Sequence, residues 1–368
     1  MTEWKTYKLG DISKFQTGKL NSNAAVENGK YPFFTCSPTT LAIDDYAFDK
    51  EAILLAGNNA EGNFSIKYFK GKFNAYQRTY IIETKNDICD IKFLFYALKI
   101  CLHQFKQMSQ GTSTKFLTAV ILNNFEISLP SLEEQRRIAG ILGAIDDKIE
   151  NNRRINDNLE QQAQALFDEW FVNDSTQPAE YNRASLTDIA NYLNGLAMQR
   201  FRPQSDEKAI PVLKIKELGQ GMCDSSSDIC SQSIDSKYIV NDGDIIFSWS
   251  GTLLVDIWCG GICGLNQHLF KVTSDKYPKW FVYYWTKYHL AKFIRIAKDK
   301  AVTMGHIKRG DLEVSEVIIP DETSFAEIDK IMSPIFNAII ANRIANRHLA
   351  SLRDTLLPKL MNGEIITK

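Results

Sequence analysis

Hydrophobic residues recur at steps of four and three along two long stretches of this 368-residue chain, from position 138 to 170 and again from 328 to 360. Heptad spacing of this kind is typical of helices that pack along their length. The pattern predicts one long helix over 131–172 and another over 321–368. At 1.5 Å per residue, forty helical residues form a rod of about 60 Å.

Two asparagines interrupt the hydrophobic seam at the same place in each stretch, namely Asn152 and Asn156 in the first and Asn342 and Asn346 in the second. Polar residues in a seam lower stability but fix the register and the partner. We therefore expect the two helices to pack on each other with these asparagines setting the register. The alternative is that each helix lies on the surface of its own domain. Pro334 and Pro358 predict a kink or a frayed first turn in the second helix.

Short β-rich runs precede each long stretch and are separated by glycine and asparagine, which is typical of strands and tight turns. The clearest runs are AILLAG (52–57), TYIIE (79–83), DIIFSW (244–249) and HLFKV (268–272), with helical patterns near 92–108 and 279–298. Each half is therefore predicted to begin with a mixed α/β domain, over 1–130 and 173–320.

The two halves repeat one plan. LGDISKFQTG (9–18) matches LTDIANYLNG (186–195) at an offset of 177, and from Gln77 and Gln267 onward the offset is 190. Halves that share their ends but differ inside have a common frame and a variable interior, where recognition usually lies. These patterns predict an α+β fold with two mixed α/β domains, a long antiparallel two-helix coiled coil between them, and an internal pseudo-two-fold repeat.

Composition and charge narrow the class of protein. With 44% hydrophobic and 24% charged residues and a net charge of −1, the chain is an ordinary globular protein and not a polycation. We find no secretory signal and no apolar run of 18 residues, and the seven cysteines are expected to be reduced thiols. We therefore expect a cytoplasmic protein with no membrane contact.

The motifs of several enzyme classes are absent from the sequence. It contains no glycine-rich run with GK[ST] spacing and no Asn-Pro-Pro-aromatic tetrad of an adenine methyltransferase. Cys259 and Cys263 have CxxxC spacing, but zinc sites usually need tighter and paired spacing. The five histidines form no catalytic constellation. We expect a non-catalytic protein that binds no metal or cofactor directly.

Local charge indicates DNA contact at one position of each repeat. Four lysines and no acidic residue lie between Ile91 and Phe125, and seven basic residues with only Asp299 against them lie from Lys287 to Arg309. The loops 110–117 and 301–308 lie within these stretches, and their small hydroxyl and basic residues can contact phosphate. The phosphate candidates are Lys106, Thr112, Ser113, Thr114, Lys115, Lys300, Thr303, His306 and Lys308.

Base recognition requires side chains that match the major-groove edges, chiefly Arg or Lys for guanine and Asn or Gln for adenine. Many such residues are ordinary surface residues, and Gln77 and Gln267 are more consistent with holding the common frame, because they match across the repeat. The candidates are Asn58, Asn59, Asn63, Lys67, Tyr76 and Arg78 in the first half and Arg200, Arg202, Lys214, Lys216, Trp249 and His268 in the second.

The segment 127–171, ISLPSLEEQRRIAGILGAIDDKIENNRRINDNLEQQAQALFDEWF, resembles the central conserved region of type I restriction–modification specificity subunits. LGDI near the start, GTSTKFL (111–117) and the terminal LLPKLMNGEI are also similar to landmarks of that family, and the resemblance covers nearly the whole chain. The second helix departs from it, with DETSFAEI (321–328) in place of SLEEQRRI (131–138).

The resemblance implies that each mixed domain is a target-recognition domain for one half of a bipartite target in double-stranded DNA. It implies that the helices act as a ruler for the gap and dock two methyltransferase subunits, which restriction/translocase subunits join. S-adenosylmethionine, ATP and Mg²⁺ are then expected on those partners and not on this chain.

Two other functions are compatible with the sequence. One is a self-contained DNA methyltransferase or endonuclease with attached target domains, which methyl transfer or cleavage without partners would reveal. The other is a coiled-coil adaptor that does not bind DNA, which a flat response to salt in DNA-binding assays would reveal.

Overall fold

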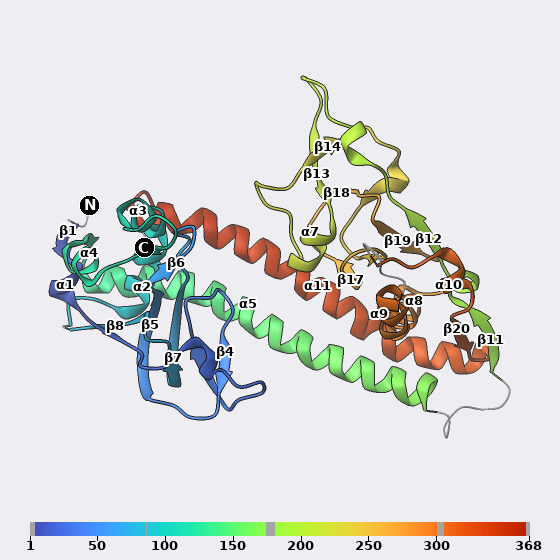
Figure 1. Cartoon of the computed structure of the whole chain (residues 1–368), viewed down its shortest axis with the longest axis horizontal. Helices are drawn as coiled ribbons and strands as arrows, with labels where there is room; N and C mark the ends of the chain where they lie inside the picture. Colours follow the sequence, from blue (N-terminus) through green and yellow to red (C-terminus); the bar gives the residue numbers. More distant parts are fainter. Residues whose placement is uncertain (1–3, 86, 174–180, 300–304, 366–368) are drawn as a thin grey trace. The chain divides into compact units, whose positions relative to one another are not determined.

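The computed structural model describes residues 4–85, 87–173, 181–299 and 305–365. The chain separates into two compact units, one formed by 1–147 with 350–368 and the other by 148–349. Each unit contains one mixed domain and a part of each long helix (Figure 1).

The mixed domain of the first unit alternates short strands with short helices. Its strands are β1 (Lys5–Lys8), β2 (Ser13–Thr17), β3 (Tyr31–Phe34), β4 (Leu41–Ile43), β5 (Phe48–Ala56), β6 (Asn58–Asn59), β7 (Ile66–Ala75), β8 (Thr79–Thr84), β9 (Lys115–Phe116) and β10 (Glu126–Leu129). Its helices are α1 (Leu9–Ile12), α2 (Ile91–Ile100), α3 (Leu102–Met108) and α4 (Ala119–Asn124), with a 3₁₀ turn at Ser22–Ala24.

A six-stranded sheet, in the order β2-β8-β5-β7-β3-β4, forms the centre of this domain. β5 pairs with both β7 and β8 and its AILLA run is fully buried, because Ile53 and Leu55 face one core and Ala52 and Leu54 face another. Burial on both faces explains why this run is continuously apolar and does not alternate. α2 begins after Asp90, whose carboxylate caps the helix.

The mixed domain of the second unit is built from a similar series of elements. Its strands are β11 (Asn182–Ser185), β12 (Asn191–Asn194), β13 (Ala209–Leu213), β14 (Ile229–Ser231), β15 (Ile239–Val240), β16 (Asp244–Ser248), β17 (Leu254–Trp258), β18 (Cys263–Leu265), β19 (Leu269–Thr273) and β20 (Glu316–Ile319). Its helices are α6 (Leu186–Ile189), α7 (Ile215–Gln220), α8 (Lys279–Tyr288), α9 (Leu290–Asp299) and α10 (Arg309–Glu313), with 3₁₀ turns at Met198–Arg200 and Ser236–Tyr238.

The second domain divides its strands between two four-stranded sheets, β12-β19-β16-β17 and β14-β13-β18-β15. An aromatic core joins the first of these sheets to α8 and to the long helices. The helical patterns predicted near 92–108 and 279–298 each form two helices, which are separated at Cys101 and His289. Both residues have the same backbone conformation at the break, with φ of −76°.

The two domains share a backbone frame at equivalent positions. Lys5 pairs with Leu129 where β1 meets β10, and Asn182 pairs with Ile319 where β11 meets β20. Gly18 and Gly195 match in the repeat for a steric reason. A Cβ at Gly18 would lie 1.8 Å from the carbonyl oxygen of Ala75, and one at Gly195 would lie 2.4 Å from that of Leu265. Only glycine permits this approach between backbones.

The two long helices are α5 (Leu132–Phe167), which a π turn at Asp168–Val172 follows, and α11 (Glu322–Met361). They are antiparallel within each unit. Asp146 pairs with Arg353 in the first unit, and Asn152 with Asn346 in the second. α11 begins well before Pro334, so this proline lies inside the helix and not in its first turn. The fold is therefore α+β, with two mixed domains and an antiparallel helix pair.

Candidate nucleic-acid interface

Three segments meet at one edge of the first domain, namely β6, β9 and the turn between β7 and β8. The backbone N–H of Gly57 donates to Arg78 O (2.8 Å), and that of Leu117 donates to Gly57 O (2.9 Å). β6 pairs antiparallel with β9, which sets Asn59 opposite Lys115. This arrangement brings together four of the candidates predicted from the sequence, Asn58, Asn59, Arg78 and Lys115.

The loop after β6 is folded by its own asparagines. Asn59 Oδ1 accepts hydrogen bonds from the backbone N–H of Glu61 (2.9 Å) and of Asn63 (3.0 Å). Asn63 Oδ1 accepts a hydrogen bond from Lys106 Nζ (2.9 Å), which ties the loop to α3. The amide oxygens of Asn59 and Asn63 therefore support the loop, and Lys106 is held beside it without a carboxylate partner among the described residues.

Arg78 is an exposed cation at this edge. Its guanidinium carbon lies 5.2 Å from the centre of the Phe116 ring, within the range of a cation–π interaction. No carboxylate pairs with Arg78 in the described part of the chain. Its charge is therefore not neutralised within the domain, while the aromatic ring restricts the position of its planar group.

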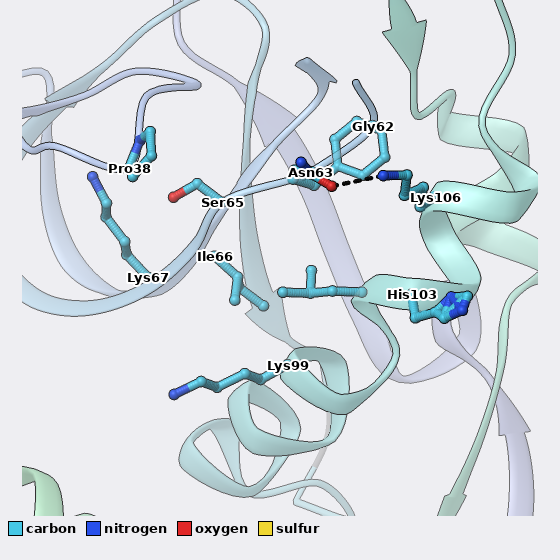
Figure 2. Close-up of a pocket in the computed structure, with 11 residues that line it drawn as sticks. Pro38, Gly62, Asn63, Ser65, Ile66, Lys67, Lys99, His103 and Lys106 are labelled. Carbon is cyan, nitrogen blue, oxygen red and sulfur yellow. Dashed lines mark hydrogen bonds between the residues drawn. The ribbon is translucent and has the colours of Figure 1, made fainter. Parts of the chain in front are cut away.

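A pocket of about 810 Å³ lies beside the same loop (Figure 2). Lys67, Lys99, Lys106 and His103 line it, and none of its described lining residues is acidic. Figure 2 shows Lys67 and Lys99 on one side and Lys106, bonded to Asn63, on the other. Burial lowers the pKa of Lys67 and also that of Lys99, because it disfavours their charged forms. An anion in this pocket would oppose that effect.

The second domain has a histidine–tryptophan cluster on the same frame. The backbone N–H of Trp249 donates to His268 O (3.4 Å), and that of Ile307 donates to Trp249 O (3.1 Å). The Trp249 ring centre lies 6.0 Å from that of His268 and 6.4 Å from that of His306. Ser250 forms a bridge with His306. The structure thus brings together three more predicted candidates, Trp249, His268 and His306.

Both ring nitrogens of His268 have partners. Nδ1 lies 3.0 Å from Ser250 Oγ, and Nε2 lies 3.3 Å from the amide nitrogen of Gln267. These two contacts occupy both ring nitrogens, so neither is left free to bind another group. Trp249 Nε1 in turn donates to Asn194 Oδ1 (2.9 Å). The cluster is therefore a fixed, hydrogen-bonded group.

Four candidates of the second domain lie apart from this cluster in the network of described contacts. Lys214 forms an ion pair with Asp228, and Lys216 Nζ donates to Ser226 Oγ (2.8 Å). Arg200 ends a 3₁₀ turn and, like Arg202, is exposed. Because local acidic or hydroxyl groups already partner the two lysines, Lys214 and Lys216 are weaker candidates than the sequence alone indicated.

The two predicted phosphate loops differ in how much of them is described. Reciprocal backbone hydrogen bonds between Gln110 and Phe116 close the first loop, which leaves Thr112 and Ser113 exposed and Thr114 half-buried. In the second loop, His306 and Lys308 are exposed. Lys300 and Thr303 lie outside the described residues.

Gln77, one of the two matched glutamines, contacts the frame. Gln77 Nε2 donates to Asn21 Oδ1 (2.7 Å), and its backbone N–H donates to Leu20 O (2.9 Å). Tyr76, next to it, is half-buried, and its backbone N–H donates to Phe34 O (2.9 Å). These contacts fit a supporting role for both residues.

The four seam asparagines form one symmetric cluster in the second unit. Asn152 Nδ2 donates to Asn346 Oδ1 (2.9 Å), and Asn342 Nδ2 donates to Asn156 Oδ1 (2.9 Å). Asn156 Nδ2 donates to Ile339 O (3.0 Å), and Asn346 Nδ2 to its repeat equivalent, Ile149 O (3.3 Å). Exchange of the two repeats maps each of these bonds onto another. The local two-fold axis of the helix pair therefore passes between the asparagine pairs.

Sequence reasoning missed several residues of these clusters, chiefly Phe116, Ser250 and Asn194. Aromatic and hydroxyl residues are common everywhere, so their type alone carries little information. The repeat offset of 190 does match Phe116 with His306, and that comparison could have identified the position. Among the described residues, no group of three or more His, Cys, Asp or Glu side chains is arranged to hold a metal ion. None of the described helices has the length and apolar character needed to cross a membrane.

Comparison with known proteins identifies the family. A family model described as "Type I restriction modification DNA specificity domain" matches the chain twice, over residues 1–161 and 178–347. The chain belongs to this family of type I restriction–modification DNA specificity subunits. Members of the family recognise a DNA sequence and are not themselves the catalytic subunits.

Individual relatives agree with this result. The EcoDI specificity subunit of Escherichia coli is 40% identical over 164 residues, which cover 45% of this chain and 35% of that protein. The MjaIX specificity subunit of Methanocaldococcus jannaschii is 27% identical over 99% of this chain and 94% of its own length. The crystal structure of an S subunit from M. genitalium shares the fold, with a TM-score of 0.66, 16% identity and coverage of 98% of this chain and 96% of its own.

Proposed function

We propose that this chain recognises a two-part sequence in double-stranded DNA, with one mixed domain, 1–130 or 173–320, for each part. The observation that carries the proposal is the repeated frame, on which Arg78 and Phe116 occur in the first domain and His268 and His306 at the equivalent positions of the second. Two different sets of side chains on one frame suit two different half-sites.

Phosphate contacts would position each domain without contributing sequence preference. In the first domain we assign this role to the lysines around the pocket, Lys67, Lys99 and Lys106, and to the exposed tip of the loop, Thr112 and Ser113. The lining of the pocket is basic, although the net charge of the whole chain is only −1. Attraction to DNA would therefore be local and would depend strongly on salt.

The helix pair would dock two methyltransferase subunits, which restriction/translocase subunits then join. Ile141 and Ile331 support this assignment, because they occupy equivalent positions of α5 and α11 and remain 38% and 47% exposed. A surface that occurs once in each repeat suits two copies of one partner. S-adenosylmethionine, ATP and Mg²⁺ would be bound by those partners. A restriction system acts where the cellular DNA is, so the proposal places the chain in the cytoplasm.

The same helices would fix the gap between the two parts of the target. The asparagine cluster supports this role, since four amides bonded across the seam oppose sliding of one helix along the other. A shift by one heptad would break these hydrogen bonds and leave the buried amides of Asn152 and Asn156 without their partners.

The proposal is tested by binding of the full chain to random duplexes across a salt series. We expect the logarithm of the binding constant to fall linearly with the logarithm of the salt concentration. A flat or absent response would favour an adaptor without DNA binding. Methyl transfer or cleavage by the chain alone, with Mg²⁺ and S-adenosylmethionine present, would favour a self-contained enzyme.

A further inference from the structure

Four positions of the shared frame combine a constant backbone with different side chains. In the first domain they hold Gly57, Asn58, Arg78 and Phe116, and in the second they hold Trp249, Ser250, His268 and His306. The equivalence rests on backbone contacts, because the hydrogen bond from residue 57 to residue 78 is repeated from 249 to 268. The pairing of Asn58 with Phe116 is likewise repeated by that of Ser250 with His306.

We propose that these four positions determine the base preference of each domain, and that Arg78 is the residue through which the first domain recognises a guanine. The inference rests on the proposed DNA-recognition function and names the residue and the base edge within it. The ligand group is the O6 and N7 pair of guanine in the major groove, which a guanidinium group contacts through two parallel hydrogen bonds.

Arg78 differs from the other cations of the first domain in the way it is held. Lys106 is bonded to an asparagine oxygen beside the pocket, and Lys67 is half-buried in its wall. Arg78 is exposed, has no carboxylate partner in the described part of the chain, and its guanidinium carbon lies over the Phe116 ring, 5.2 Å from the ring centre. A guanidinium group held over an aromatic ring keeps a planar set of donors available in a restricted position, which the single ammonium group of a lysine does not provide.

The second domain shows what replaces this arrangement. His268 occupies the position of Arg78, but Ser250 and Gln267 occupy both of its ring nitrogens. The ring therefore supports Trp249 and has no free nitrogen with which to contact a base edge. The second half-site should consequently lack the guanine that Arg78 selects, and its preference should depend on the exposed His306 and on the face of Trp249.

The test is selection of binding sequences from a random duplex library by the full chain and its variants. The wild-type chain should enrich a two-part motif with a guanine in one part. Arg78→Ala and Arg78→Lys should each lower the preference for that guanine by about tenfold or more, without changing the other part. Arg78→Lys keeps the charge, so its overall affinity should remain close to that of the wild type.

Two matched variants complete the design. Lys106→Ala should weaken binding to all sequences alike and reduce the slope with salt, as expected for a phosphate contact. Lys70→Ala removes an exposed lysine elsewhere on β7 and should change neither the overall affinity for DNA nor its dependence on salt. The inference is overturned if Arg78→Ala enriches the wild-type motif, or if it weakens all sequences alike. If the wild-type chain enriches no motif, the proposed function fails, and the inference fails with it.

Discussion

The two units attach their mixed domains to the helix pair with different chemistry at equivalent positions. In the first unit, Gln135 on α5 donates to Ile88 O (2.9 Å) and to Pro130 O (3.0 Å), and its own oxygen accepts from the backbone of Asp90 (2.9 Å). The repeat equivalent of Gln135 in the second unit is Phe325, whose ring centre lies 5.1 Å from that of Phe281.

A second pair of equivalent residues, Asp146 and Phe336, also has a polar residue in the first unit and an aromatic one in the second. Asp146 accepts hydrogen bonds from Tyr96 (2.7 Å) and Arg353 (2.7 Å) in the first unit. Its equivalent in the second unit, Phe336, packs at 5.5 Å on Tyr283. One frame thus tolerates either a polar or an aromatic junction. The stability of the polar junction depends on the direction of its hydrogen bonds and on complete pairing of its buried polar groups. The stability of the aromatic junction depends on the apolar area that it buries.

The largest expected effect is at the aromatic junction. Phe167 is fully buried and stacks on Tyr284, and its repeat equivalent in the first unit is Leu357. We expect Phe167→Ala to destabilise the second unit by about 3–5 kcal/mol, because it leaves a cavity in an aromatic core. Leu357→Ala, the matched change in the first unit, should cost about 2 kcal/mol. Hydrogen exchange followed separately in each unit measures both effects. A smaller loss for Phe167→Ala would contradict the comparison.

The polar junction should respond to loss of pairing and not to loss of volume. Gln135→Met keeps the size of the side chain but leaves one N–H and two carbonyl groups unpaired, which should cost about 1–3 kcal/mol. Phe325→Met, the matched change, should cost less than about 1.5 kcal/mol, because it exchanges one large apolar side chain for another. Urea denaturation monitored in each unit compares the two. Equal losses in the free energy of unfolding would show that hydrogen-bond pairing is not more important at the first junction than at the second.

The helices and the repeat could be predicted from the sequence, because both depend on local periodicity. The seam from 138 to 170 contains no proline, and α5 follows it from Leu132 to Phe167. The buried run at 52–57 was predicted as a strand and forms the end of β5. The breaks at Cys101 and His289 were missed, since neither residue is a helix breaker and tertiary packing decides the turn there.

Residue type predicted the candidate interface less well than it predicted the fold. Arg78, Lys106 and His268 were predicted, and they lie in or beside clusters on the frame. Lys214 was predicted equally, but it forms an ion pair with Asp228, a partner fourteen residues away that its local sequence pattern does not reveal. Which cation remains available is decided by such pairings, and these depend on the fold. The DNA-binding roles themselves remain predictions.

The smallest expected effect is a pH dependence confined to the second unit. Burial lowers the pKa of His289, and Lys292 lowers it further, while the hydrogen bond to Glu316 O acts in the opposite direction. The unfolded chain therefore binds a proton near pH 6.5 that the folded unit takes up only at lower pH. The stability that the second unit owes to a neutral His289 is therefore complete above about pH 6.5. It is lost as the pH falls through the pKa of His289 in the folded unit.

Cys101, which ends α2 as His289 ends α8, has its pKa raised to about 11 by burial, so it stays a neutral thiol throughout this range. Acidification from pH 7.5 to 5.5 should therefore speed hydrogen exchange around α8 more than around α2, after correction for the intrinsic rate. His289→Gln keeps a donor for Glu316 O but cannot titrate, and it should remove the difference between the units. If the difference persists in His289→Gln, the histidine is not its source, and the aromatic junction must be sensitive to acid for another reason.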